Sequence, residues 1–235
     1  MSFSSFELLD HSKPIVVFGR DGQVGKALQT CLKDLKVPVV FLGRADCDLS
    51  DEASITQILN QYQPQVIINA AAYTLVDQAE LEPELAYQVN TVAPGVLAMK
   101  AEELDIPLIH FSTDYVFDGL KKEAYVEIDP THPQSVYGKT KYEGEEKVRS
   151  HVKHIILRTS WVFGIHGHNF LKTILRLIKE RDELSIVNDQ RGSPTSATLL
   201  SELTFNMVQQ IAHNKNFKDF GSTDPIFDQD ILIHS

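Results

Sequence analysis

The chain has 235 residues, of which 43% are hydrophobic, and it carries a formal net charge of -10 at pH 7. This length and apolar content are sufficient for one domain with a sizeable core. The acidic balance argues against sequence-independent binding to nucleic acid or to an anionic membrane, because both need a basic surface.

The strand candidates are apolar at nearly every position and alternate with amphipathic helical patterns. Strands of this kind indicate a parallel sheet covered on both faces. We therefore predict an α/β fold, a doubly wound (Rossmann) parallel sheet. In chain order the candidate strands are residues 15–18, 37–42, 65–70, 107–111, 154–158 and, more weakly, 184–187.

Helix boundaries and domain limits follow from local signals. Ser50 or Asp51 marks one helix start and Asn169 another, while Pro94 inside a helical stretch predicts a break or a kink. We expect a loose extension over residues 1–13, a Rossmann domain over 14–164, and a further region with an atypical tail over 165–235.

Cysteine content and hydropathy bear on the compartment. Cys31 and Cys47 are too few for a disulfide framework and fit a reducing compartment. No run has the length of a membrane span, and residues 1–13 lack the basic start and apolar stretch of a signal peptide. We expect a cytoplasmic protein with no membrane partner and no nucleic-acid partner.

A glycine turn follows the first strand, with the spacing G-x-x-G-x-x-G. Glycines permit a tight turn and close approach of the backbone, and the free N–H groups of the following helix can bind a pyrophosphate. A plain turn is the alternative, but the flanking strand and helix favour a dinucleotide site, and we therefore expect residues 14–164 to form an NAD(P)-binding Rossmann domain. The expected cofactor contacts here are Gly19, Gly22, Gln23, Val24 and Gly25.

The second and third strands also end in candidate cofactor residues. An acid after the second strand would bind the ribose 2′-hydroxyl of NAD, whereas Arg44 there could pair with a 2′-phosphate, which favours NADPH. Asp46 keeps NADH open. After the third strand, small side chains let a cofactor pass close to the backbone, although they could simply pack a strand on a helix. The other expected contacts are Asp48, Leu49, Ala70, Ala71 and Ala72.

Tyr137 and Lys141 are the most informative pair. Their spacing of four places them one helical turn apart on one face. A neighbouring cation favours phenolate and lowers the pKa of a phenol from its usual ~10, so the pair can act as a general acid or base and can also contact a cofactor. A solvated helix face is the alternative.

Five ordered motifs carry a family resemblance: NAAAYTLVDQAE, FSTDYVFDG, YGKTKYEGE, LRTSWVFG and NDQRGSPT. With the glycine turn, the chain from about Ile15 to about Val208 resembles the dTDP-4-dehydrorhamnose reductase family of the extended short-chain dehydrogenase/reductase superfamily. The resemblance implies hydride transfer from NADPH or NADH to the C4 ketone of the nucleotide sugar dTDP-4-dehydro-6-deoxy-L-mannose, giving dTDP-L-rhamnose.

The same resemblance implies roles for individual residues. Thr113 would orient the carbonyl, Tyr137 would protonate the alkoxide, and Lys141 would hold the nicotinamide ribose. Asn90 lies where superfamily members often carry an asparagine that positions the lysine, with a surface polar residue as the alternative. The implied substrate contacts are Thr74, Val76, Tyr115 and Trp161.

Other polar residues have simpler interpretations. Arg158 is interpreted as structural. His166 and His168 have no cysteine or carboxylate near them in sequence, which makes a poor metal site, so we expect no metal.

Two other functions stay open. A non-catalytic NAD(P)-binding regulatory subunit, like that of methionine adenosyltransferase, carries a similar YGKTK segment, although RTSWVFG and NDQRGSPT favour the reductase. An epimerase or dehydratase acting on another nucleotide sugar is the second alternative, and Asp114 beside Thr113 keeps the dehydratase open.

The chain departs from the family pattern after Val208. That pattern continues with a tyrosine-histidine strand, a serine/threonine-tryptophan helix and a further helical segment, whereas residues 214–235 show no helical period. The resemblance therefore implies that residues 165–235 form a partial substrate-binding region with a small, incomplete substrate lid over the nucleotide sugar. A homodimer stays open.

Overall fold

The computed structural model describes residues 9–233 except 34, 152, 187, 189, 191 and 214–228. Its main sheet has six parallel strands in the order β2-β1-β3-β4-β5-β8. The sheet grows in opposite directions from β1 and β3, so a topological switch point lies between them, where doubly wound sheets bind ligands. The strands are β1 (Ile15–Phe18), β2 (Val39–Leu42), β3 (Val66–Asn69), β4 (Leu108–Thr113), β5 (His154–Thr159) and β8 (Gln229–Leu232).

The five stronger strand predictions are confirmed, with small shifts at their ends. β2 begins only at Val39, because Pro38 has no N–H to donate to the ladder. The weak sixth prediction is wrong: residues 184–186 have no regular secondary structure, and residue 187 lies outside the described chain. A second, two-stranded sheet instead pairs β6 (Val162–Phe163) with β7 (Thr195–Ser196).

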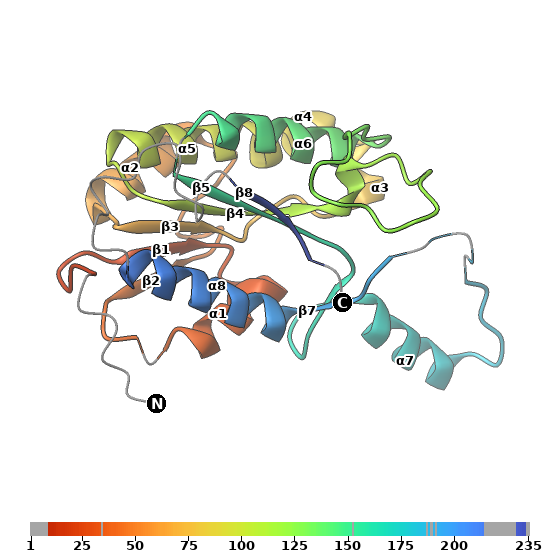
Figure 1. Cartoon of the computed structure of the whole chain (residues 1–235). Coiled ribbons are helices and arrows are strands. Elements are labelled where there is room, and N and C mark those ends of the chain that lie inside the picture. Colours follow the sequence, from red (N-terminus) through yellow and green to blue (C-terminus); the bar gives the residue numbers. More distant parts are fainter. Residues whose placement is uncertain are drawn as a thin grey trace.

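Helices cover both faces of the main sheet, as predicted (Figure 1). α1 (Gln23–Cys31) and α8 (Ala197–His213) lie on one face. On the other lie α2 (Glu52–Tyr62), α5 (Ala93–Glu103) and α6 (Val136–Arg149), with the short α3 (Val76–Ala79) and α4 (Pro83–Tyr87).

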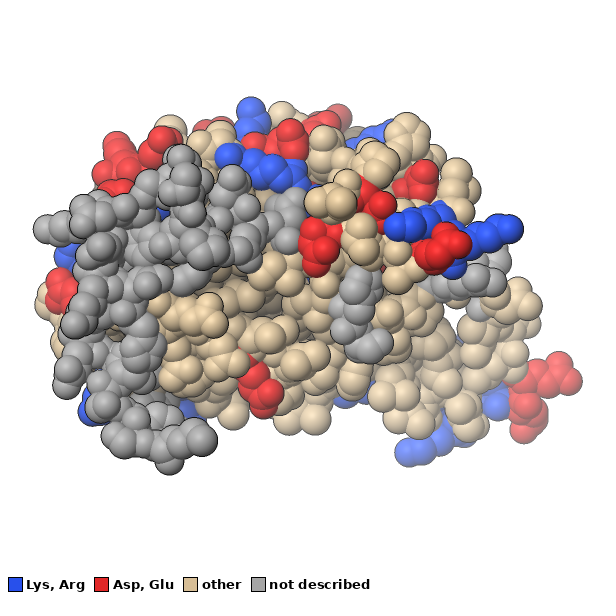
Figure 2. Space-filling view, viewed as in Figure 1, with Lys and Arg blue, Asp and Glu red and all other residues tan. Residues whose placement is uncertain are grey.

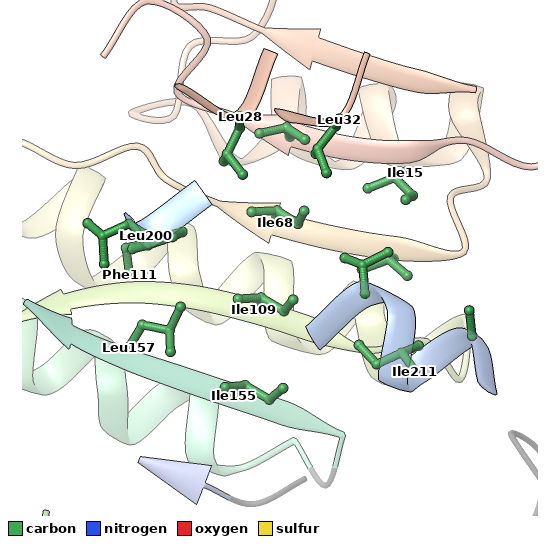
Figure 3. Close-up of a cluster of buried hydrophobic side chains, with 14 of the residues drawn as sticks. Ile15, Leu28, Leu32, Ile68, Ile109, Phe111, Ile155, Leu157, Leu200 and Ile211 are labelled. Atoms are coloured by element: carbon green, nitrogen blue, oxygen red, sulfur yellow. The ribbon is translucent and has the colours of Figure 1, made fainter. Parts of the chain in front are cut away.

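Two apolar clusters form the core, one on each side of the sheet. Because side chains alternate along a strand, Ile15 and Val17 face the α1 and α8 side, where they pack near Leu28 and Leu200 (Figure 3). Val16 and Phe18 face the other side and pack with side chains of α2 and α5. Burial on both faces explains why the strands read as continuous apolar runs.

Two expected domain limits differ from the structure. α8 packs against α1, and β8 pairs with β5, so residues after 164 complete the sheet layer rather than lying wholly in a substrate region. At the other end, residues 1–8 lie outside the described chain, but Leu9 is buried in the core and Asp10 accepts and donates hydrogen bonds with Gln65. Residues 9–13 are therefore anchored rather than loose.

The predicted helix signals are confirmed. Asp51 caps α2 by accepting from the Ala53 N–H, and Asn169 caps α7 (Phe170–Glu180) by accepting from the Lys172 N–H. A π-helical turn, η1 (Gln88–Val92), precedes α5, whose first turn contains Pro94. The missing N–H of proline disrupts the regular α-helical ladder there.

α7 stands away from the sheet (Figure 1). The helix is described in full, and none of its residues is buried. Four of its apolar side chains are at least half exposed: Phe170, Leu171, Leu175 and Ile178.

The surface carries charges of both signs. Figure 2 shows lysine and arginine side chains interspersed with acidic ones along the upper edge of the face in view. Among the described helices, none is both long enough and apolar enough to cross a membrane.

Candidate active site

A cavity of about 610 Å³ lies at the carboxyl ends of β1, β3 and β4. It brings together thirteen of the predicted site residues. These are Gly19, Gly22, Gln23, Val24, Arg44, Asp48, Leu49, Ala70, Ala71, Ala72, Thr74, Tyr137 and Lys141. Gly25, Val76, Thr113, Tyr115 and Trp161 lie outside the set of described residues that line it.

The three glycines of the turn serve different purposes. Gly19 has φ +93, and a Cβ atom there would lie 2.6 Å from the Ala70 carbonyl carbon. A Cβ atom at Gly25 would lie 2.0 Å from the Gly19 carbonyl oxygen, so this glycine lets α1 start against the turn. At Gly22 the nearest atom would be 3.4 Å away, which leaves this position open toward the cavity. The turn can therefore cradle a pyrophosphate.

The end of β2 carries both signs of charge. Asp46 accepts from the Gly43 N–H at 2.8 Å and pairs with Arg20 at 2.6 Å. Arg44 lines the cavity with a largely exposed side chain, 3.8 Å from Asp48. The acid that kept NADH open is thus already paired, while Arg44 stays near the cavity wall. Sequence reasoning missed Arg20, which lies inside the glycine turn.

Tyr137 is buried at the cavity, near the start of α6. Ser135 caps this helix by accepting from the Gly138 N–H. Gly138 lets the helix approach the next loop, because a Cβ atom there would lie 2.3 Å from the Tyr115 carbonyl oxygen. The rings of Tyr115 and Tyr137 meet edge to face, with centroids 5.5 Å apart.

The pKa of Tyr137 differs from the sequence expectation. Burial raises it to about 12, while a hydrogen bond with Thr113 acts in the opposite direction and the nearby Asp114 raises it further. The expected lowering by Lys141 is therefore wrong for this structure. Desolvation of a phenolate outweighs the cation, because the Lys141 ammonium binds other groups.

The groups that Lys141 contacts belong to β4. Lys141 Nζ donates to the Phe111 carbonyl oxygen at 2.7 Å and lies 3.3 Å from His110 Nε2. Its side chain is 1% exposed, and burial lowers the pKa of Lys141 to about 8. His110 is fully buried, and burial, with Lys141 and His154 nearby, holds its pKa well below the ordinary value. Sequence reasoning missed His110, although its place inside an apolar strand was visible.

Asn90 is buried, so the alternative of a surface polar residue is wrong. Its side chain donates to and accepts from the backbone of Tyr73 and donates to Thr140 Oγ1 at 3.2 Å. Asn90 of η1 therefore links Tyr73, which precedes α3, to Thr140 of α6. Thr140 is the residue before Lys141.

The expected substrate residues fall into two groups. Thr74 lines the cavity, and Val76 and Tyr115 pack in a small apolar cluster with Tyr137. Trp161 does not line the cavity, although its sequence neighbour Val162 does. The backbone of Trp161 is left-handed, with φ 44, and its ring lies against Gly192, where a Cβ atom would be 2.7 Å from it. Trp161 thus supports the loop that precedes β7.

Thr113 and Asp114 end β4. Thr113 Oγ1 donates to the Asp114 carboxylate at 3.2 Å, and burial raises the pKa of Asp114. Beside them, the buried Ser112 hydroxyl lines the cavity and has no hydrogen-bond partner within the described protein. An orphaned hydroxyl at this place fits a polar ligand.

Gln23 links the glycine turn to α7. Its amide donates to the Val162 carbonyl oxygen at 3.0 Å and accepts from Asn169 Nδ2 at 2.9 Å. Gly167 and His168, which lie between Val162 and Asn169 in the sequence, also line the cavity. These long-range contacts leave no trace in local sequence.

Arg158 is structural, as expected. Its guanidinium donates to both carboxylate oxygens of Glu145, at 3.0 and 2.7 Å, and both side chains are buried. No group of three or more potential metal ligands occurs among the described residues.

Comparison with known proteins shows a consistent family. The model of the family described as RmlD substrate binding domain matches residues 13–222. The dTDP-4-dehydrorhamnose reductase of Escherichia coli (strain K12) is 43% identical over 205 residues, which cover 86% of this chain and 68% of that protein. The spore coat polysaccharide biosynthesis protein SpsK of Bacillus subtilis (strain 168) is 38% identical over 82% of this chain and 69% of that protein.

Solved structures point to the same family. A dTDP-4-dehydrorhamnose reductase from Clostridium acetobutylicum superimposes with a TM-score of 0.83 at 36% identity, covering 94% of this chain and 74% of that one. A reductase of the same name from Bacillus anthracis, solved in complex with NADP, has a TM-score of 0.82 at 34% identity over 95% of this chain and 74% of that one.

Proposed function

We propose, from the premise that this chain belongs to the dTDP-4-dehydrorhamnose reductase family, that it reduces the C4 ketone of dTDP-4-dehydro-6-deoxy-L-mannose to give dTDP-L-rhamnose. The observation that carries the proposal is one cavity with the open glycine turn in its wall and both Tyr137 and Lys141 at its base. The cavity therefore combines a dinucleotide cradle with a proton donor.

The residues present fit NADPH. The open position at Gly22 and the N-terminus of α1 would hold the pyrophosphate, and Arg44 would pair with the 2′-phosphate. The orphaned Ser112 hydroxyl would gain a partner. When bound, NADPH supplies the hydride.

The protein's own groups would handle the substrate carbonyl and the proton. Thr113 would donate a hydrogen bond to the carbonyl oxygen, and this bond strengthens as negative charge develops there. The raised pKa of Tyr137 keeps its phenol protonated at neutral pH, which suits a general acid in the reductive direction. Lys141 would hold the nicotinamide ribose.

The remaining predicted residues would contact the sugar of the substrate. Thr74 lines the cavity, and Val76 and Tyr115 pack in one apolar cluster with Tyr137, which supports sugar contacts there. Trp161 would contact the sugar from the segment next to Val162, a residue that lines the cavity.

Two finer proposals concern the surroundings of the enzyme. Cys31 and Cys47 are free thiols, which supports a reducing compartment such as the cytoplasm. The exposed apolar side chains of α7 support self-association as a homodimer. Analytical ultracentrifugation of the protein and a Leu175→Glu variant tests this, and an unchanged monomer in both contradicts it.

The decisive experiment is an assay with the nucleotide sugar. The protein should oxidise NADPH stoichiometrically when given dTDP-4-dehydro-6-deoxy-L-mannose, and the product should be dTDP-L-rhamnose by NMR. Nucleotide binding without oxidation would identify a regulatory subunit. A retained, non-exchanging nucleotide with no net oxidation would indicate an epimerase or a dehydratase.

A further inference from the structure

A chain of buried polar groups runs behind the cavity from β3 to α6. The Ala71 N–H donates to Asn69 Oδ1 at 3.2 Å, Asn69 Nδ2 lies 3.1 Å from His110 Nδ1, and His110 Nε2 lies 3.3 Å from Lys141 Nζ. Asn69, His110 and Lys141 are each at most 1% exposed. Asn69 and His110 are fully buried and do not line the cavity, so water has no access that could satisfy them in another way.

The direction of the hydrogen bonds along this chain is fixed at its β3 end. A backbone N–H can only donate, so Asn69 turns its oxygen toward Ala71 and its NH₂ group toward His110. His110 Nδ1 must then accept, which leaves the proton of the neutral imidazole on Nε2. That Nε2–H points at Lys141 Nζ.

Lys141 completes the chain as an acceptor. An ammonium has three N–H donors and no lone pair, so it would set donor against donor at His110. An uncharged amine can accept from His110 Nε2–H with its lone pair, donate one N–H to the Phe111 carbonyl oxygen, and keep its second N–H for a ligand in the cavity.

We propose that Asn69 and His110 are positioning residues that hold Lys141 as a proton acceptor, so that it gains and loses a proton readily at working pH. The role in turnover rests on the proposed function. After Tyr137 has given its proton to the substrate oxygen, the ammonium form of Lys141 would pass a proton to the phenolate and become the uncharged amine that accepts from His110 Nε2–H, and this amine would then regain a proton from solvent. The lowered pKa of Lys141 agrees with this geometry.

The charges around Lys141 are few. Glu145, one turn further along α6, favours the ammonium, but its carboxylate is paired with Arg158 and Arg149. On the sheet side, His154 of β5 acts on His110. Tyr137 lies one turn before Lys141 on α6. Neither Asn69 nor His110 carries charge in the proposed state, so their influence comes from hydrogen-bond direction.

The test uses NMR on the cofactor-free protein, where no catalysis is needed. Imidazole ¹⁵N spectra should show His110 of the wild type protonated on Nε2. In Asn69→Asp the new carboxylate should draw a proton onto Nδ1, which lets Nε2 accept from an ammonium. The pKa of Lys141, followed by labelled lysine, should rise by about one unit. His110→Gln, whose amide can turn to accept, should raise it in the same direction.

Each variant has a control and a kinetic readout. His151→Gln changes another buried histidine, whose ring contacts the Ile106 carbonyl oxygen and neither His110 nor Lys141, and it should leave the Lys141 pKa in place. The basic limb of the pH profile of kcat should move upward in Asn69→Asp, while KM for NADPH changes little. A wild-type His110 protonated on Nδ1, or a Lys141 pKa unchanged in both variants, overturns the proposal. If the NMR shifts appear but the protein does not reduce the sugar, the proposed function fails and the positioning role stands.

Discussion

Asn169 Nδ2 donates to the Gln23 side-chain oxygen at 2.9 Å, and this hydrogen bond joins the first residue of α1 to the cap of α7. Since no residue of α7 is buried, the contact is a principal attachment between that helix and the cofactor turn. Occupancy of the turn and order in α7 should therefore be coupled.

Breaking this contact should loosen residues 164–180. Asn169→Ala removes both the bridge and the helix cap, at a cost of about 1 kcal/mol, so amide exchange there should accelerate about fivefold. Gln23→Ala removes the bridge and the hydrogen bond to the Val162 carbonyl oxygen but keeps the helix cap, and it should have a smaller effect. Asn60→Ala, at an exposed position of α2, is the control. Equal exchange in all three variants would show that the bridge does not hold α7.

Substitutions at two glycines of the turn should have different effects, one on NADPH binding and the other on the free energy of unfolding. Gly22→Leu should fold normally but weaken NADPH binding at least about tenfold by calorimetry, because its side chain enters the open side of the turn. Gly25→Ala should lower the free energy of unfolding by about 1–3 kcal/mol, because its Cβ atom collides with the Gly19 carbonyl oxygen. Tight binding by the Gly22 variant would place the pyrophosphate elsewhere.

Tyr137→Phe should lower kcat roughly 10²-fold or more while NADPH affinity persists, because only the proton donor is lost. Tyr142→Phe is a matched control on the same helix, since Tyr142 packs in a separate cluster with Val116 and Phe117. Comparable losses of binding and turnover in the Tyr137 variant would indicate a structural phenol.

Because burial lowers the pKa of Lys141, the free energy of unfolding should depend on pH. Its pKa is about 8 when folded and 10.5 in an unperturbed side chain, so below pH 8 the folded state bears the full cost of burying the charge. Between pH 8 and 10 the folded protein releases this proton first, and its contribution to stability rises with pH. Above pH 10, ionisation of Tyr137 in the unfolded chain reverses the trend.

Lys141→Met should accordingly be more stable than the wild type at pH 7, by about 2–3 kcal/mol, and should lose much of that advantage by pH 10. Urea denaturation at the two pH values measures the difference. A constant gap between the proteins would mean that the ammonium is not penalised by burial.

Much of this molecule could be predicted from local sequence. The apolar runs of β1 and β3 to β5, the caps Asp51 and Asn169, and the spacing of Tyr137 and Lys141 all depend on neighbours a few residues away. The glycine turn, the strand ends and the family motifs together supplied the expected residues of the cavity wall, thirteen of which the structure brings together. The roles of those residues stay predictions.

The remainder depends on contacts that no local pattern contains. α8 has an apolar face with Leu200, Val208 and Ile211 that could have been read as helical, but its docking on α1 could not. The pKa of Tyr137 was misjudged because spacing along a helix shows proximity and not burial. His110 was overlooked because a histidine inside an apolar strand resembles ordinary core.

The place of β8 in the sheet has a consequence for synthesis. β5 is made long before residues 229–232, its partner on the outer side, leave the ribosome. At typical elongation rates this interval lasts on the order of several seconds, during which β5 presents an unpaired apolar edge. Nascent chains on one messenger would be most prone to join edge to edge in that interval, so a chaperone acting during translation would raise yield more than one added afterwards.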